Sequence, residues 1–394
     1  MINNEKARAW ESADSTFAAH CARRHIPLRG TFELTPRCNF HCKMCYLHQT
    51  SEEINLRGKR ELTTNEWIKI AEDAINAGTL NLMITGGEPL LRDDFATIYN
   101  EINQMGFIIG LNTNASLLDE KYYRLFSKYP PSTVSVTLYG ADRETYRRIT
   151  GNEGHFDNTV KGLEYLKDIP TSLDIKVTFI KDNYHKLDRI RETANRYTDR
   201  FAINYMVFKP VPGVSSEAES CRLSAKECLN IDISNRKYYY ELRKKTGTEN
   251  EYDPAASEND PHRDYGLDIY PEVLTCLAAK AAYWISWDGR MLPCATFDEM
   301  ATEPLKEGFS EAWNRLPELF AGIRHPEECV KCEHFYTCPN CPAYFFAETG
   351  SYDTVSPYIC DMVKERTKSD KQEDSRRRPQ DKTAKQCKTI NNTD

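Results

Sequence analysis

Three closely spaced cysteines lie in a loop that could hold an iron-sulfur cluster. Residues 35–46 read T-P-R-C-N-F-H-C-K-M-C-Y and place Cys38, Cys42 and Cys45 in a C-x3-C-x2-C array. Three thiolates in one short loop can bind three irons of a cubane 4Fe-4S cluster, because thiolate is the ligand that such clusters require. The fourth iron keeps no protein ligand, so a small molecule with an amine and a carboxylate can bind there. A structural zinc loop is the alternative, since zinc uses the same ligands.

The array, followed by the aromatic Tyr46, resembles the signature of the radical S-adenosylmethionine (SAM) enzymes. The resemblance implies that Cys38, Cys42 and Cys45 hold a catalytic 4Fe-4S cluster, that SAM binds its open iron and that Tyr46 belongs to the cofactor site. It also implies that reductive cleavage of SAM gives a 5'-deoxyadenosyl radical, which takes hydrogen from an unactivated carbon. The protein would then position the substrate and exclude water.

A Gly-Gly-Glu-Pro turn follows the next apolar run, which covers residues 80–85. Two glycines at a strand end let the backbone approach a ligand closely, and the acid can accept from an ammonium. Alone the motif is a weak signal, because an ordinary turn after a strand gives the same letters. In the radical SAM family it contacts the amino group of the methionyl part of SAM, and the resemblance assigns that role to Gly86, Gly87 and Glu88.

Polar residues at two further strand ends are candidates for binding the adenosine. Asn114 follows the third expected strand and Thr137 lies on the fourth, and both are expected cofactor contacts. Relatives often have an acid where this chain has Tyr139. Relatives also often have an arginine before a glycine where this chain has Thr150, so Arg147 or Arg148 would have to anchor the carboxylate of SAM. A solvated helix face is the alternative for these two arginines.

A second group of cysteines resembles the SPASM domain, a module with auxiliary clusters found in radical enzymes that modify peptides and certain other substrates. One spacing departs from the usual pattern, since the last gap is two residues instead of three. By the resemblance, one auxiliary 4Fe-4S cluster uses Cys276, Cys294 and Cys341. The other uses Cys329, Cys332, Cys338 and Cys360. A zinc ribbon over residues 329–341 is the alternative, because paired C-x2-C knuckles are common zinc sites.

The first auxiliary set has only three obvious ligands. Its fourth could be Cys221 or Cys228, water, or a group of the substrate. If residues 221–228 form one helix, the seven-residue spacing puts both thiols on a similar face. The alanine after Cys294 replaces an acid that sulfatase-maturing relatives carry there, which disfavours that activity, although Asp298 lies close in sequence.

Strands and helices alternate through residues 28–210, which predicts a parallel sheet built from right-handed βαβ units. Six such units make a partial (β/α)6 TIM-like barrel, the fold that the resemblance implies, followed by a small cysteine-rich α+β domain for the auxiliary clusters. The three thiolates would lie at the carboxyl end of the first strand, where α/β folds place their chemistry. The expected strands cover residues 30–34, 80–85, 107–111, 133–138, 173–180 and 201–208.

The chain is expected to divide into five parts. These are an N-terminal extension (1–27), the radical SAM partial barrel (28–210), a bridging region (211–275), the SPASM auxiliary-cluster domain (276–361) and a disordered tail (362–394). The tail is expected to be disordered because it is polar and almost free of apolar residues. A helix is expected over residues 224–245 of the bridge.

The composition and net charge of the chain argue against several classes of function. The 394 residues carry a formal net charge of -7, which argues against a general nucleic-acid binder. No run of about 18 apolar residues is present, so no membrane span is expected. The first residues lack a secretory signal, and we expect a cytoplasmic location. The cytoplasm is reducing, so we expect the 14 cysteines to bind metal rather than to form disulfides.

The combined interpretation is a radical SAM oxidoreductase that modifies or cross-links a peptide. Its auxiliary clusters would accept the electron left when the substrate radical forms a new bond. Oxidation or decarboxylation of a small molecule such as a tetrapyrrole or a sugar is the alternative, and a zinc-binding adaptor is the non-enzymatic one. Expected partners are the substrate, an electron donor such as flavodoxin or ferredoxin, and a separate peptide-recognition protein.

Overall fold

A computed structural model describes residues 15–210, 214, 216–246 and 276–377. Six parallel strands follow one another across a curved sheet in the order β6-β5-β4-β3-β2-β1, and β7 and β8 extend it past β1. This confirms the predicted α/β class and the six-stranded partial barrel. The strands are β1 (Arg29–Glu33), β2 (Asn81–Thr85), β3 (Ile108–Thr113), β4 (Thr133–Thr137), β5 (Ser172–Thr178), β6 (Phe201–Asn204), β7 (Ala282–Ile285) and β8 (Met291–Leu292).

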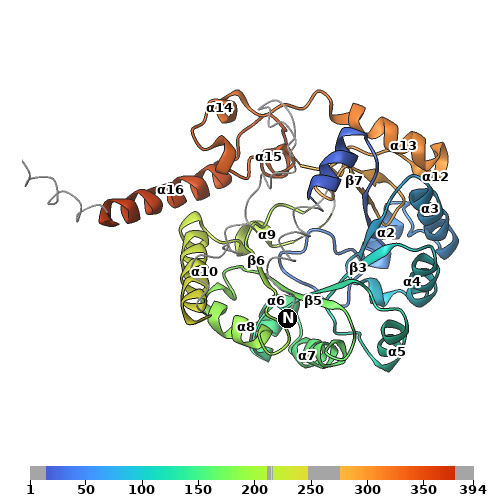
Figure 1. Ribbon diagram of the computed structural model, residues 1–394, viewed down its shortest axis with the longest axis horizontal. Helices are drawn as coiled ribbons and strands as arrows, with labels where there is room; N and C mark the ends of the chain where they lie inside the picture. Colours follow the sequence, from blue (N-terminus) through green and yellow to red (C-terminus); the bar gives the residue numbers. More distant parts are fainter. Residues whose placement is uncertain (1–14, 211–213, 215, 247–275, 378–394) are drawn as a thin grey trace, which may run out of the picture.

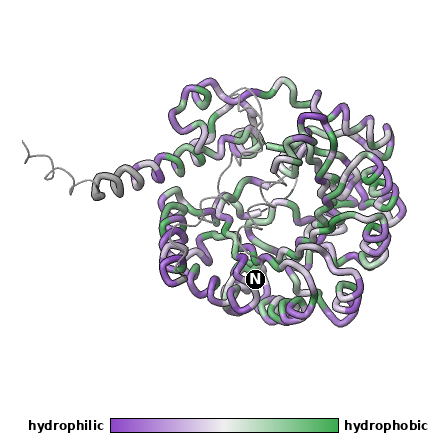
Figure 2. The backbone as a smooth tube through the Cα atoms, viewed as in Figure 1, coloured by the Kyte–Doolittle hydropathy of each residue, from purple (hydrophilic) through white to green (hydrophobic). Residues whose placement is uncertain are grey.

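Helices cover the outer face of the sheet and leave its inner face open toward the centre of the molecule (Figure 1). Figure 2 shows hydrophilic residues along the peripheral helices, as expected for elements with one face in water. The barrel helices are α2 (Ser51–Leu56), α3 (Thr64–Asn76), α4 (Phe95–Gln104), α5 (Glu120–Lys128), α6 (Arg143–Thr150), α7 (Gly154–Leu166) and α8 (Leu187–Ala194), with 3-10 turns η1 (Pro89–Leu91) and η2 (Tyr184–Lys186).

Local sequence explains where these helices begin. Thr63 caps α3: its hydroxyl accepts from the backbone of Glu66, whose carboxylate accepts from the backbone of Thr63. The apolar face of α3 then packs on the sheet, where Trp67 and Phe32 are fully buried against each other. Burial of aromatic residues of this size supplies about 2 kcal/mol or more each. Packing of the helices on the sheet thereby fixes the positions of the strand ends, which carry the polar residues.

The cysteine-rich region continues the barrel sheet instead of forming a separate one. Strand β7 pairs in parallel with β1, and β8 returns antiparallel to β7. Helices α12 and α13 pack against α3. The remaining elements are α9 (Ala218–Cys221), α10 (Ala225–Thr246), α12 (Pro304–Glu307), α13 (Phe309–Arg315), η3 (Leu316–Phe320), α14 (Glu327–Val330), η4 (Phe335–Thr337), α15 (Pro342–Thr349) and α16 (Pro357–Arg377).

The C-terminal flank of the chain differs from its prediction. The disorder predicted from residue 362 is wrong as far as Arg377, because α16 runs through this segment. Met362 and Val363 are buried, and Arg366 forms an ion pair with Asp232 of α10, Nε to carboxylate 2.7 Å. The N-terminal extension contains a helix over residues 15–23, while most of the bridge lies outside the described residues. Among the helices that the structure describes, none is long and apolar enough to cross a bilayer.

Candidate active site

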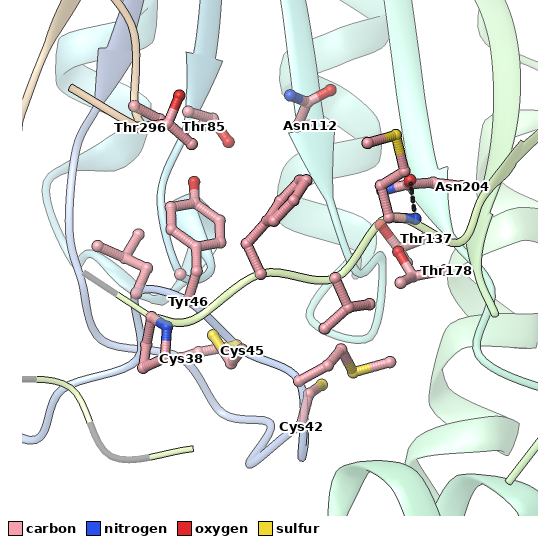
Figure 3. A pocket seen from close by; sticks show the side chains of 18 of the residues that line it. Cys38, Cys42, Cys45, Tyr46, Thr85, Asn112, Thr137, Thr178, Asn204 and Thr296 are labelled. Atoms are coloured by element: carbon pink, nitrogen blue, oxygen red, sulfur yellow. Dashed lines mark hydrogen bonds between the residues drawn. The ribbon is translucent and has the colours of Figure 1, made fainter. Parts of the chain in front are cut away.

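The three-cysteine loop lies at the carboxyl end of β1 and lines a cavity of about 740 Å³. Backbone hydrogen bonds tie it to α6: the N–H of His41 donates to Thr150 and that of Lys43 to Ile149, both at 3.1 Å. Cys38, Cys42 and Cys45 all face this cavity, as Figure 3 shows. The cysteine loop is therefore held in place by β1 and α6, and its thiols point into the cavity.

Burial disfavours the charged form of the three thiols unless a metal binds them. Burial raises the pKa of Cys38 to about 12, and the negative charge of Glu88 raises it further. Burial likewise raises the pKa of Cys42, and the neighbouring thiolate of Cys45 adds to the effect. Iron supplies the positive charge that would stabilise such thiolates. The backbone N–H of Phe40 lies 3.3 Å from the sulfur of Cys38, a contact typical of cluster ligands.

Within the described ranges, no three His, Cys, Asp or Glu side chains converge closely enough to hold one metal ion. A cubane cluster binds its thiolates at separate corners, so its ligands stand farther apart than those of a single ion. The absence of such a group among the described residues does not by itself distinguish a cluster loop from a zinc loop.

The two glycines of the Gly-Gly-Glu-Pro turn allow β2 to approach the cysteine loop. A Cβ atom on Gly87 would lie 2.4 Å from the carbonyl oxygen of Arg37, and one on Gly86 would lie 2.7 Å from that of Thr35. The Gly87 N–H donates to Thr35 across this contact at 2.7 Å. Both glycines line the cavity, as expected, and no larger residue fits without moving the loop.

Glu88 occupies a different place from the one predicted. Its carboxylate is fully buried and accepts from the Thr113 hydroxyl and the Asn114 N–H, each at 2.7 Å, and from the Leu90 N–H at 3.1 Å. It does not line the cavity. Burial raises its pKa to about 7, against the lowering effect of these donors. The structure thus corrects the expected contact with an ammonium: Glu88 joins the ends of β2 and β3 and positions Asn114.

The other predicted cofactor residues do line the cavity. Tyr46 stands beside the cysteines, and Thr137 points in from the end of β4 (Figure 3). The amide nitrogen of Asn114 lies 3.7 Å from the sulfur of Cys38 and donates to Asn39 at 2.9 Å. The side-chain oxygens of Asn112 and Ser135, which also line the cavity, are buried without a hydrogen-bond partner. Such atoms indicate a polar ligand.

Sequence reasoning missed most of the polar lining. The missed residues share one feature, since they occupy alternate, inward-facing positions near the carboxyl ends of successive strands. A search for polar residues at period two in otherwise apolar strands would have found them. They are Thr85, Asn112, Lys176, Thr178 and Asn204.

Comparisons with known proteins agree with this site. Residues 32–194 match the model of the Radical SAM superfamily. The protein is a radical SAM enzyme. It uses a 4Fe-4S cluster and SAM as cofactors. The matched segment contains the cysteine loop, the glycine turn and the polar carboxyl ends of β2, β3, β4 and β5.

Known relatives and solved structures align with most of the length of this radical SAM enzyme. It is 28% identical to an AdoMet-dependent heme synthase of Methanosarcina barkeri over 357 residues, which cover 86% of this chain and 97% of that protein. It is 23% identical to an Fe-coproporphyrin III synthase of the same organism, over 78% of this chain and 81% of that one. The fold resembles SuiB of Streptococcus suis bound to SAM (TM-score 0.62, 17% identity, 91% and 81% of the two chains) and native anSMEcpe bound to AdoMet (0.68, 16%, 88% and 98%).

The arginines considered for the carboxylate of SAM lie outside the site of this radical SAM enzyme. Arg147 pairs with Glu144 on the surface of α6, and Arg148 pairs with Asp182. Neither lines the cavity, which receives its positive charge from Lys176 and Lys209. The predicted role of the two arginines therefore has no support in this arrangement.

The seven cysteines of the C-terminal region separate into two groups. Burial raises the pKa of Cys341, and the thiolates of Cys276 and Cys294 raise it further. Burial raises the pKa of Cys338 to about 12, and there the nearby thiolates are Cys329, Cys360 and Cys332. The members of each group are those that the SPASM resemblance assigns to one auxiliary cluster, and their role as ligands stays a prediction. A zinc ribbon would need Cys338 and Cys341 around one ion, whereas here they face different partners.

Neither candidate for the fourth ligand joins the first set. Cys221 packs with Met44 and Val207 near the cysteine loop of the barrel. Cys228 lies 4.0 Å from the hydroxyl of Tyr358. The two residues belong to separate helices, α9 and α10, so the single helix on which a shared face depended does not form. Among the described residues, the first auxiliary set has three thiols.

A carboxylic acid in the barrel wall was also missed. Glu33 ends β1 at 4% exposure, in register with Thr85, and shares a small void with Tyr46 and Trp284. Burial raises its pKa to about 8 from an ordinary 4.5; Asp288 and Asp298 add to this, while the indole N–H of Trp284 opposes it. Glu33 is therefore mostly protonated at neutral pH in the folded protein.

Replacing Glu33 with glutamine should change how stability depends on pH. Between pH 4.5 and 8 the folded protein holds a proton at Glu33 that the unfolded chain has released, so the free energy of unfolding falls as pH rises through this window. Glu33→Gln removes that loss, and at pH 8 the variant should be more stable by about 4 kcal/mol. Anaerobic urea unfolding at pH 5 and pH 8 measures it. Equal pH dependence in both proteins would contradict the protonated state.

Proposed function

We propose that this radical SAM enzyme oxidises a substrate held between its barrel and its auxiliary-cluster region. One observation carries the proposal: a single cavity is lined by Cys38, Cys42 and Cys45 and also by Ala295 and Tyr344, which follow auxiliary cysteines in the chain. A molecule in this cavity would contact both regions. Generation of a radical and removal of the remaining electron can then act on the same bound substrate.

We assign the SAM-binding cluster to Cys38, Cys42 and Cys45. When bound, the cluster and SAM supply a 5'-deoxyadenosyl radical by reductive cleavage. A one-electron donor such as flavodoxin or ferredoxin would be needed. The chain provides the polar wall of Asn112 and Ser135 for hydrogen bonds to the ligands. Phe40, which also lines the cavity, is held in place by stacking on His155. Two auxiliary clusters, held by the two cysteine groups, would accept the electron.

Among substrate classes we propose a small carboxylated molecule, with a tetrapyrrole as the leading case. Relatives whose names state heme or Fe-coproporphyrin III synthesis align with both the barrel and the cysteine-rich region. A volume of about 740 Å³ is in the range of small-molecule sites. The lining also combines hydrophobic side chains with a few polar groups, as such sites do.

A modified peptide is the second candidate. Its support is the shared architecture, since one similar structure is SuiB with its precursor peptide, at a TM-score of 0.63 and 18% identity. Asp298, the acid near Cys294, is paired with Arg290 at 2.8 Å, so it is not poised for the role of the acid found in sulfatase maturases. Recognition by a separate protein remains part of this second proposal.

The substrate classes can be separated with the reconstituted enzyme under anaerobic conditions. We expect Fe-coproporphyrin III to increase 5'-deoxyadenosine formation and to lose carbon dioxide, because its propionates place unactivated carbons beside carboxylates. Liquid chromatography with mass detection follows both products. The matched comparison is a pool of short cysteine-containing peptides. Stimulation and mass loss with the peptides alone would reverse the order of the two candidates.

A further inference from the structure

A threonine hydroxyl contacts the sulfur of one predicted auxiliary ligand. The Oγ1 atom of Thr296 lies 3.0 Å from the Sγ atom of Cys294. A metal-bound thiolate carries no proton, so the hydroxyl is the donor of this hydrogen bond once a cluster is bound. Burial raises the pKa of Cys294, and the Thr296 hydroxyl and the backbone N–H groups of Thr296 and Phe297 act against that rise. The sulfur of Cys294 therefore lies among donors that favour its negative charge.

The turn that carries Thr296 is anchored by its neighbours in the chain. The side chain of Phe297 is buried, and its N–H donates to the carbonyl oxygen of Cys294 at 3.1 Å. On the other side, the backbone carbonyl and the carboxylate of Asp298 accept from the guanidinium of Arg290 at 2.7 and 2.8 Å. The hydroxyl of Thr296 is thus held beside the sulfur by fixed contacts before and after it.

Thr296 also lines the cavity, on the side away from the cluster loop. Figure 3 shows its side chain at the opposite end of the view from Cys42. A substrate between these two ends would have the source of the radical on one side and Thr296 on the other. Cys341, another thiol of the first auxiliary set, packs with Cys294 against the same small buried cluster. Thr296 therefore contacts both the substrate space and a ligand of this set.

The proposed reaction requires an acceptor for one electron at this place. After hydrogen abstraction, a propionate radical forms a carbon-carbon double bond and its carboxylate leaves as carbon dioxide, which releases one electron and no proton. Hydrogen bonds to the sulfur ligands are among the factors that set the reduction potential of an iron-sulfur cluster. A donor stabilises the extra negative charge of the reduced state, so it raises this potential.

We propose that the Thr296 hydroxyl, through its hydrogen bond to Cys294, raises the reduction potential of the first auxiliary cluster so that this cluster accepts the electron of the substrate radical. The inference rests on the proposed function, because it assigns a residue to the electron acceptor of that reaction. Thr296 is a positioning residue, since it acts through the ligand Cys294 and not on the substrate itself.

The test is a potentiometric titration of the reconstituted enzyme with SAM, followed by electron paramagnetic resonance. The signal that Cys294→Ala lacks identifies the first auxiliary cluster. We expect Thr296→Val to make reduction of this cluster about tenfold less favourable, which lowers its midpoint potential by about 59 mV for one electron. Thr296→Ser keeps the hydroxyl and should restore the potential. Thr178→Val is the matched control, because it removes a hydroxyl from the wall of the same cavity on β5, and it should leave the potential of this cluster unchanged.

Each outcome supports or overturns a distinct statement. An unchanged potential in Thr296→Val would overturn the role of Thr296 and leave the proposed function standing. Equal shifts of all cluster signals would also overturn it, because the substitution would then act on the whole protein. Loss of about four irons from Thr296→Val would do the same, since the hydroxyl would then be needed to hold the cluster and not to set its potential. Failure of Cys294→Ala to remove any signal would reject the place of Cys294 in the proposed function and with it this inference.

Discussion

Replacing Cys38, Cys42 or Cys45 with alanine should abolish formation of 5'-deoxyadenosine, to below about one thousandth of the unmodified rate. Each thiol is the proposed ligand of one cluster iron, and no other cysteine in the described part of the chain faces the cavity beside this loop. Without the cluster, no electron reaches SAM. Chromatographic measurement of 5'-deoxyadenosine with dithionite as reductant gives the rate.

Iron content shows whether the loss is local. Reconstituted enzyme should hold about 12 irons per chain if three 4Fe-4S clusters are present, and each variant should keep about 8. Cys228→Ala is the matched control, because this thiol is buried beside Tyr358 and belongs to none of the three proposed ligand sets, and it should keep full iron and activity. An unmodified protein with about 4 irons and bound zinc would reject the two auxiliary clusters.

Removing Cys294 or Cys341 should separate cleavage of SAM from formation of product. Both belong to the auxiliary group beside the cavity, where Ala295 and Tyr344 form part of the lining. If this group accepts the substrate electron, Cys294→Ala and Cys341→Ala should still cleave SAM but lose more than about 90% of product, since the substrate radical has no acceptor. The measurement is the ratio of 5'-deoxyadenosine to oxidised substrate.

Two controls make this ratio informative. A variant in the other auxiliary group, Cys332→Ala, removes an exposed thiol that does not line the cavity, and it tests whether both groups are needed. Circular dichroism verifies that the proteins remain folded. Product formation at the unmodified ratio in Cys294→Ala and Cys341→Ala would show that this group has only a structural role.

The sequence alone was sufficient for the elements that depend on local pattern. The cysteine spacing predicted the cluster loop because its three ligands lie within eight residues, and no distant segment is needed to bring them together. The six strands were also predictable, since a parallel sheet covered by helices needs continuous apolar runs such as the one ending at Thr85. The helix over residues 225–246 began within one residue of its predicted start.

The polar composition of the C-terminal segment gave a wrong prediction of disorder, because a few contacts decide its structure. Residues 362–377 are mostly polar, yet α16 forms because Met362 and Val363 are buried and Arg366 reaches Asp232. No residue bounds were predicted for α4 or α6, although the apolar residues of α4 recur at helical spacing and Asp142 caps α6. The average polarity of a segment does not reveal which of its residues make such contacts.

Tertiary structure alone decided which distant residues share the cavity. The direction of the Glu88 side chain depends on donors at the end of β3, and the separation of Cys338 from Cys341 depends on which distant cysteines lie beside each of them. Lys176 becomes a cavity residue only because β5 curves with its neighbours into a partial barrel. Sequence spacing fixes the ligands within one loop, whereas contacts between strands depend on sheet curvature and register, to which many separate residues contribute.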